Sequence, residues 1–447
     1  MTTNLTKGHI TKTLLIYSVP MMISIIFQQM YSIVDSIVVG QYVGENALAA
    51  VVASFPITMI LIAVASGSSI GSSVVIGQLF GAKSLTKMKT TINTALITAF
   101  AISGILTVLG IVFGNPLLQM MKTPAEIIVD SRAYLFIYIY GFIFLMVYNV
   151  CNGIFTALGN SRIPLYFLIG SSLTNVGLDL FFVIGLNMGV AGAAWATFIS
   201  QGVAMLLSIT VLLNKLTHIH TDEKPEKFSK DSLQNLSRVA LPSILQQSFI
   251  AIGNLFVQGE INGYGASVIA GYGSAVRLNT FAIMSINTLA SGISGFTAQN
   301  YGAKQFDRIE KGFKTGIAIV SVVVTPFVIV FLLLSSQMIG IFIKEDSEQA
   351  IRTGIMFLRI VAPFYYIVAV KIISDSLLRG SGNMKPFVIA TFADLLMRVI
   401  FVYILSYAFK NSDILWAAWP IGWCVSMVLS LFYAVSQIKR MKRLKAE

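Results

Sequence analysis

Five carboxylates lie within stretches of sequence that are otherwise almost entirely apolar: Asp35, Asp179, Glu260, Asp375 and Asp394. On insertion scales, a charged side chain at the centre of a bilayer costs about 2.5 to 3.5 kcal/mol. An acid in that position therefore needs a counter-charge, a proton, a bound cation or water. Which of these each acid has determines the chemistry that it can do.

The last two of these acids each have a base on the same predicted helix. Lys371 precedes Asp375 by four residues, and Arg398 follows Asp394 by four residues. Residues four apart share one face of a helix, so we expect two intrahelical ion pairs. Glu260 lies near the end of its apolar stretch, where an interfacial location explains it equally well.

Asp35 and Asp179 differ because no Lys or Arg falls inside the apolar stretches of the N-terminal half. Gln28 lies seven residues before Asp35, and Asn175 lies four residues before Asp179, so each acid shares a helix face with an amide. Oxygens of this kind suit a hard cation such as Na⁺. A carboxyl group withdrawn from water can instead carry a proton. Both alternatives stay open, and a site shared by the two acids is geometrically reasonable.

The composition of the chain indicates that these acids lie in membrane-spanning helices. Of 447 residues, 56% are hydrophobic and 11% are charged, whereas soluble domains carry about a quarter charged residues. Soluble, disordered and nucleic-acid-binding proteins are thereby excluded. The chain contains twelve apolar runs of the length needed for a membrane-spanning helix, near 14–39, 51–77, 91–113, 133–157, 164–186, 190–213, 239–263, 268–299, 315–336, 354–378, 386–409 and 413–437. We therefore predict an all-α polytopic membrane protein.

The basic residues predict the orientation of these spans. The net charge is +12, and most of the 31 Lys and Arg residues fall in alternate loops and at both termini. Cytoplasmic loops are enriched in these residues. We therefore expect a multi-pass protein of the cell inner (cytoplasmic) membrane with both termini in the cytoplasm.

The two halves of the chain repeat each other at a spacing of 221 residues. The matching residues are Gly44 and Gly265, Gly71 and Gly292, Gln78 and Gln299, Gly81-Ala82-Lys83 and Gly302-Ala303-Lys304, and Trp195-Ala196 and Trp416-Ala417. Each half has six spans, so both begin on the same side of the membrane and form parallel repeats. We predict an N-lobe at 1–214, a cytoplasmic linker at 215–238 and a C-lobe at 239–447.

Several segments, weak alone but specific together, carry a family resemblance. They are VDSIVVGQYVGENALAAV (34–51), GQLFGAKS (77–84), ALGNSRIP (157–164), LTNVGLDLFFVIG (173–185) and GVAGAAWATFISQ (189–201). With twelve spans in two repeats, the chain resembles the multidrug and toxic compound extrusion (MATE) transporters. The resemblance implies a secondary active antiporter that exports organic, often cationic, amphipathic compounds in exchange for H⁺ or Na⁺ by alternating access of two lobes.

The resemblance also implies roles for particular residues. The set implied for cation or proton coupling, with Na⁺ as one candidate ion, is Asp35, Asn175, Asp179 and Thr197. The set implied for the substrate cavity is Gln28, Tyr31 and Asn152. Glu260 and Asp375 resemble the acids of a second site in the C-lobe, although Lys371 stands beside Asp375 here. Because the N-lobe set is complete, we place coupling there.

The expected partners are small organic cations or drugs and the lipid bilayer, with no nucleic acid. We expect a monomer that uses no cofactor beyond its coupling ion. A flippase for a lipid-linked precursor is the alternative, but its cavity would need bases to hold a diphosphate. An intramembrane enzyme would need a DDxxD, HExxH or Ser/His constellation, and the sequence contains none.

Overall fold

The computed structural model describes residues 4–43, 45–121, 123–343, 347–409 and 412–446, with side chains for all of these except 31–41, 45–48, 412 and 446. The described residues form helices joined by short turns, without a β-strand. The helices of the first half are α1 (Ile10–Tyr42), α2 (Glu45–Gly81), α3 (Leu85–Met120), α4 (Ile128–Ala157), α5 (Arg162–Asp179), the π-helical turn η1 (Leu180–Gly185) and α6 (Gly189–Thr217). Those of the second half are α7 (Lys230–Asn262), α8 (Ala266–Gly302), α9 (Phe306–Leu333), α10 (Ser335–Gly340), α11 (Glu348–Val361), η2 (Ala362–Phe364), α12 (Tyr365–Gly380), α13 (Met384–Phe409), α14 (Ser412–Leu415) and α15 (Ala418–Ala446).

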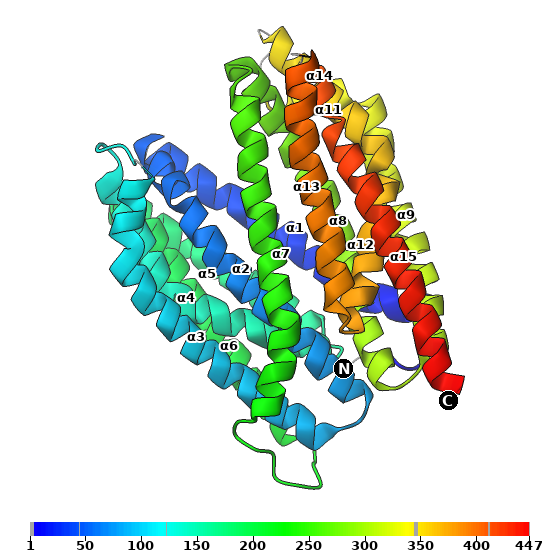
Figure 1. The fold of residues 1–447 in the computed structure, drawn as a ribbon. Coiled ribbons are helices and arrows are strands. Elements are labelled where there is room, and N and C mark those ends of the chain that lie inside the picture. The colour runs from blue at the N-terminus through cyan, green and yellow to red at the C-terminus, as the bar shows by residue number, and fades with distance from the viewer. Residues whose placement is uncertain (1–3, 44, 122, 344–346, 410–411, 447) are drawn as a thin grey trace. The chain divides into compact units, whose positions relative to one another are not determined.

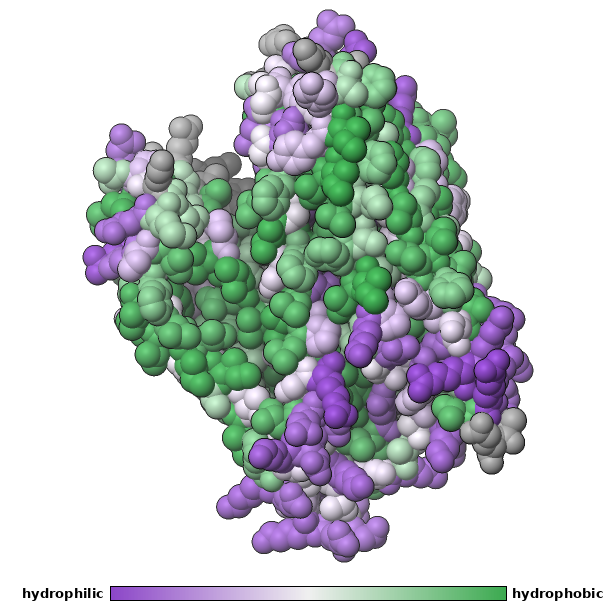
Figure 2. Space-filling view, in the orientation of Figure 1, coloured by the Kyte–Doolittle hydropathy of each residue, from purple (hydrophilic) through white to green (hydrophobic). Residues whose placement is uncertain are grey.

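Twelve membrane-spanning segments are confirmed among the described residues, since twelve helical segments are long and apolar enough to cross a bilayer. The tenth consists of α11, η2 and α12 in succession. Figure 2 shows the result on the surface, where hydrophobic residues cover the sides of the helices and hydrophilic residues gather over the 218–229 loop and the end of α15. The predicted fold class is therefore confirmed.

The chain forms two compact units that exchange helical segments. Unit 1 holds Val19–Ile244, together with Asn4, and unit 2 holds Leu5–Ser18 and Leu245–Glu447. The first part of α1 thus belongs to unit 2, and the first part of α7 to unit 1 (Figure 1). Each of these helices has a proline close to the changeover, Pro20 in α1 and Pro242 in α7. Proline removes a backbone hydrogen bond, which lets a helix bend there.

The first parts of α1 and α7, which belong to the other unit than the rest of each helix, pack against repeated glycines. A Cβ atom added to Gly71 in α2 would lie 2.7 Å from the Cβ of Ala240 in α7. A Cβ atom added to Gly292 in α8 would lie 2.1 Å from the Oγ of Ser18 in α1. Both contacts are closer than a side chain allows, so each glycine lets the exchanged helix approach its backbone. The recurrence of glycine at the 221-residue spacing thus has a packing reason.

The repeated GAK triplets end α2 and α8 in the same way. Lys83 and Lys304 both have a left-handed backbone, with φ of 57° and 55°. The amide of Ser84 donates to the carbonyl of Leu79 at 3.0 Å, and the amide of the residue after Lys304 makes the corresponding bond at 2.8 Å. This is the Schellman arrangement, which satisfies the last carbonyl groups of a helix. The triplets therefore act as helix stops.

The N-terminal segment is anchored to unit 2 by polar contacts. Leu5 is fully buried, and its amide donates to the Oε1 of Gln299 at 3.1 Å. The guanidinium group of Arg308 donates to the carbonyl oxygens of Lys7 and Gly8, each at 2.8 Å. These bonds fix the chain just before the exchanged part of α1 begins.

We expect Arg308→Ala to loosen this segment selectively. Hydrogen bonds to charged groups contribute about 1.5 to 3 kcal/mol, and each 1.4 kcal/mol corresponds to a tenfold change in an equilibrium. Amide hydrogen exchange at Leu5 should accelerate by about tenfold or more. Lys311→Ala, which removes an exposed charge from the same helix, is the control and should leave the exchange unchanged. Equal protection in both variants would show that Arg308 does not anchor the segment.

Candidate functional site

Two buried polar residues lie on one face of α5. Asn175 and Asp179 are four residues apart, and each is only 1% exposed. The spacing places both side chains on the same side of the helix. A buried carboxyl group and a buried amide on one face form the polar centre of unit 1.

The helix changes its geometry immediately after this acid. α5 ends at Asp179 and continues as the π-helical turn η1, in which the amide of Leu186 donates to the carbonyl of Phe181 at 2.9 Å. The neighbouring helix approaches closely here, because a Cβ atom on Gly192 of α6 would lie 3.2 Å from the backbone of Phe182. Single π-helical turns are frequent at functional sites. Hydropathy carries no signal for this turn, because the segment is uniformly apolar.

Thr197 of α6 connects the second helix to this centre. The Nδ2 of Asn175 donates to the Oγ1 of Thr197 at 3.4 Å, a long hydrogen bond that joins α5 to α6. The structure thus brings together two members of the predicted coupling set and places the third described member, Asp179, one turn along the same face of α5.

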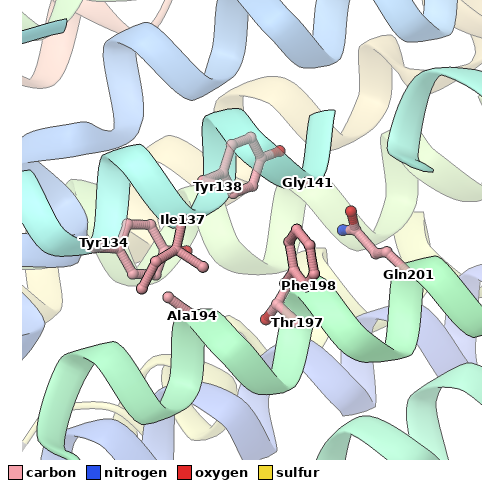
Figure 3. Close-up of a pocket in the computed structure, with 8 residues that line it drawn as sticks. All are labelled: Tyr134, Ile137, Tyr138, Gly141, Ala194, Thr197, Phe198 and Gln201. Carbon is pink, nitrogen blue, oxygen red and sulfur yellow. The ribbon is translucent and has the colours of Figure 1, made fainter. Parts of the chain in front are cut away.

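A small cavity adjoins Thr197 between α4 and α6 (Figure 3). Its volume is about 10 Å³, and its polar lining residues include Tyr134, Tyr138, Thr197 and Gln201. In Figure 3 the side chain of Gln201 extends toward the ring of Phe198. A cavity of this size with several polar partners suits one ordered water molecule. Sequence reasoning did not find Tyr134, Tyr138 or Gln201, since one polar group on an apolar helix gives no distinctive pattern.

The remaining predicted residues of the N-terminal half have different placements. Asp35 and Tyr31 lie in α1, but their side chains are outside the described residues. Gln28 is exposed on the same helix. Asn152 lies in α4, and its Oδ1 atom is buried without a hydrogen-bond partner among the described residues. Their contributions to a substrate cavity stay predictions.

In unit 2, the two predicted acids of a second site have separate partners. Glu260 of α7 accepts a hydrogen bond from the hydroxyl group of Ser406, which also lies 2.7 Å from the hydroxyl group of Tyr264. Asp375 of α12 accepts from the Oγ of Ser430 in α15 at 2.6 Å. Each acid thus lies in a polar cluster of its own.

Both predicted intrahelical ion pairs of unit 2 are confirmed. The Nζ of Lys371 lies 3.0 Å from the Oδ2 of Asp375, and the Nη2 of Arg398 lies 3.1 Å from the Oδ2 of Asp394. The structure adds a contact across helices, because the Nζ of Lys371 also lies 3.9 Å from the Oδ2 of Asp394. The two pairs therefore form one buried cluster with two positive and two negative groups.

This fold, with its two repeats and its buried polar centre, is that of a polytopic membrane transporter. The MatE family model matches the chain twice, at residues 20–181 and 241–404. The chain belongs to the multidrug and toxic compound extrusion (MATE) family of multidrug efflux transporters. It is thus a multi-pass protein of the plasma membrane and not an enzyme.

Individual relatives agree with this assignment along nearly the whole chain. The probable multidrug resistance protein YoeA of Bacillus subtilis (strain 168) is 28% identical, covering 96% of this chain and 94% of the relative. The multidrug export protein MepA of Staphylococcus aureus (strain bovine RF122 / ET3-1) is 21% identical, covering 92% and 90%.

Solved structures show the same fold. A crystal structure of MATE in complex with MaL6 matches with a TM-score of 0.93 and 26% identity, covering 99% of both chains. The outward-facing conformation of a multidrug resistance MATE family transporter of the MOP superfamily matches with a TM-score of 0.92 and 25% identity, covering 98% of both chains.

Proposed function

We propose that the protein exports small organic compounds, including amphipathic cations, in exchange for Na⁺ or H⁺, and that unit 1 holds the coupling site. The coupling residues are Asp35, Asn175, Asp179 and Thr197. The observation that carries the proposal is the burial of Asn175 and Asp179 on one face of α5, with Asn175 hydrogen-bonded to Thr197 of α6. The sequence supplies no base inside the six apolar runs of the N-terminal half to neutralise the acids.

The buried acids of unit 2 support the assignment of coupling to unit 1, because they already form ion pairs. Asp375 and Asp394 contact Lys371 and Arg398. A neutralised carboxylate gains little from binding a further cation. An acid with no basic residue in the apolar run around it gains much more, and the low dielectric of the interior strengthens that attraction.

The proposed exchange links the two fluxes through α1. This helix carries Asp35 and the cavity residues Gln28 and Tyr31, and it also contributes to both units, with Pro20 near the changeover. Binding of a cation or proton at the coupling site changes the bend of α1 and weakens the binding of substrate in a cavity that includes Asn152. A ligand drives such a transition only through different affinities for the two states. With both termini in the cytoplasm, alternating access of the two lobes moves substrate outward.

The substrate class follows from the relatives and from the residue types available. The names of YoeA and MepA refer to multidrug resistance and multidrug export. The chain has 18 Met and 30 Phe residues. Met side chains adapt to varied apolar shapes, and aromatic rings attract cations. We infer a cavity that accepts varied organic cations.

Transport by purified protein in proteoliposomes tests the proposal. Efflux of a fluorescent organic cation is measured with a pH gradient alone, with a Na⁺ gradient alone and with neither. We expect one of the two gradients to accelerate efflux, which also identifies the coupling ion. Equal efflux under all three conditions would contradict coupled exchange.

Thr197→Val tests the hydroxyl group of the coupling site. Valine keeps the shape of threonine but cannot accept the hydrogen bond from Asn175. Losing one neutral hydrogen bond costs about 0.5 to 1.5 kcal/mol, so we expect the concentration of coupling ion at half-maximal efflux to rise by about 2- to 10-fold. Thr197→Ser should restore the native value. Thr174→Val removes an exposed hydroxyl group from α5 and is the matched control. Equal ion dependence in all variants would exclude Thr197 from the site.

A further inference from the structure

The buried charged cluster of unit 2 is the strongest feature that the proposed coupling site does not use. It consists of Lys371 and Asp375 on α12 and Asp394 and Arg398 on α13. The first three are at most 6% exposed. The four charges balance one another, and the ammonium group of Lys371 lies between two carboxylates, 3.0 Å from Asp375 and 3.9 Å from Asp394. Lys371 therefore compensates acids on two different helices. A further base, Arg379, lies one turn after Asp375 on α12, and its guanidinium group donates instead to the hydroxyl groups of Ser294 and Ser376.

The cluster occupies helices that correspond to those of the coupling site. In the chain order of the repeat, α12, α13 and α15 stand where α4, α5 and α6 stand in the first half. In unit 1, these helices carry Asn175, Asp179 and Thr197. Both units thus bury carboxylates in equivalent bundles, and in unit 2 these carboxylates form ion pairs with Lys371 and Arg398.

The buried cluster also contains hydroxyl groups that could act as oxygen ligands. Asp375 accepts a hydrogen bond from the Oγ of Ser430 at 2.6 Å. Thr391 lies three residues before Asp394 on α13, which places it on the same face of the helix. It is 3% exposed, and its Oγ1 has no hydrogen-bond partner within the described residues. Carboxylate and hydroxyl oxygens are the ligands that hard cations prefer.

We propose that the ammonium group of Lys371 is a built-in cation that fills a monovalent-cation site in unit 2. The ligands of this site are Asp375, Asp394 and Ser430. Native unit 2 therefore binds no Na⁺. Replacing Lys371 by an uncharged residue leaves one negative charge in excess among Asp375, Asp394 and Arg398 and a space among their oxygen atoms. The site then accepts Na⁺.

Na⁺-dependent stability of the full-length protein tests this inference. All variants carry Asp35→Asn and Asp179→Asn, which remove both acids of the proposed coupling site in unit 1, so failure here leaves the proposed function unaffected. The melting temperature in detergent is measured in NaCl and in N-methyl-D-glucamine chloride at equal ionic strength. We expect Na⁺ to raise the melting temperature of Lys371→Met and not that of the parent. Lys371→Arg is the control that keeps the charge, and it should behave as the parent does.

A second substitution tests whether Na⁺ stabilises the Lys371→Met protein by binding at Asp375. Adding Asp375→Asn to Lys371→Met should abolish the Na⁺ effect, because it removes the uncompensated carboxylate. Binding of radioactive Na⁺ should follow the same order among the variants. A folded Lys371→Met protein that neither binds Na⁺ nor is stabilised by it would overturn the inference.

If Lys371→Met alone does not fold, a double variant that removes both charges of the ion pair still tests the inference. Removing one partner of a buried ion pair is far more destabilising than removing both. The double variant Lys371→Met/Asp375→Asn should then yield folded protein, with a higher melting temperature than Asp375→Asn alone. Failure of the double variant to recover folding would show that Lys371 does not serve as the counter-charge of Asp375, and would also overturn the inference.

Discussion

Asp179→Asn is expected to abolish most gradient-driven efflux while leaving a folded protein. Asparagine has nearly the same shape as aspartate, but it carries no charge and cannot exchange a proton. The apolar runs predicted for the first six spans contain no Lys or Arg, so we expect the substitution to leave no uncompensated positive charge within them. Coupling free energies of 1 to 3 kcal/mol correspond to changes of about 5- to 150-fold. We expect a loss of that size in the initial rate of efflux from proteoliposomes under the driving gradient.

Two measurements separate loss of coupling from loss of structure. Asp222→Asn removes an exposed acid from the linker between α6 and α7 and should retain the native rate. The Asp179→Asn protein should still bind a fluorescent organic cation, because the proposed substrate cavity does not require this carboxylate. Native efflux by the well-inserted variant would remove Asp179 from the coupling site.

The number of spans could be predicted because the bilayer imposes a simple requirement. Each crossing needs about 20 consecutive apolar residues, whatever the partners of that helix are. The ion pairs of Lys371 with Asp375 and of Arg398 with Asp394 were equally accessible, since residues four apart always meet on a helix. Both predictions depend on local sequence alone.

Features that depend on contacts between distant segments could not be predicted in this way. The approach of Lys371 to Asp394 joins two helices, and no spacing rule specifies it. Hydropathy also does not indicate that the first parts of α1 and α7 belong to the other unit than the rest of each helix. The repeated Gly71 and Gly292 lie where these two segments pack. The π-helical turn after Asp179 reflects packing against α6. The residues of the proposed coupling site could therefore be suggested from the sequence, whereas the arrangement of Asn175, Asp179 and Thr197 required the structure.

Gly67→Ala is expected to be among the most destabilising single-methyl substitutions, because it blocks the docking of α7 on α2. A Cβ atom at this position would lie 2.7 Å from the amide nitrogen of Ile244 and 2.9 Å from its Cα. A side chain can rotate away from such a contact, but backbone atoms move only if the helix shifts. Overpacking of this kind costs about 1 to 3 kcal/mol, and occasionally more. The melting temperature in detergent and the yield of monodisperse protein should both fall clearly.

Two other glycines show whether the backbone contact is the cause. Gly292→Ala meets the hydroxyl group of Ser18, which can rotate, so its loss should be smaller and should be partly restored by Ser18→Ala. Gly104→Ala has no atom within 4 Å of the added Cβ. Alanine favours a helix over glycine by about 1 kcal/mol, so this variant should be as stable as the native protein or slightly more stable. If Gly67→Ala is as stable as Gly104→Ala, the first part of α7 does not dock on α2 at Gly67, and the exchange of segments loses its support.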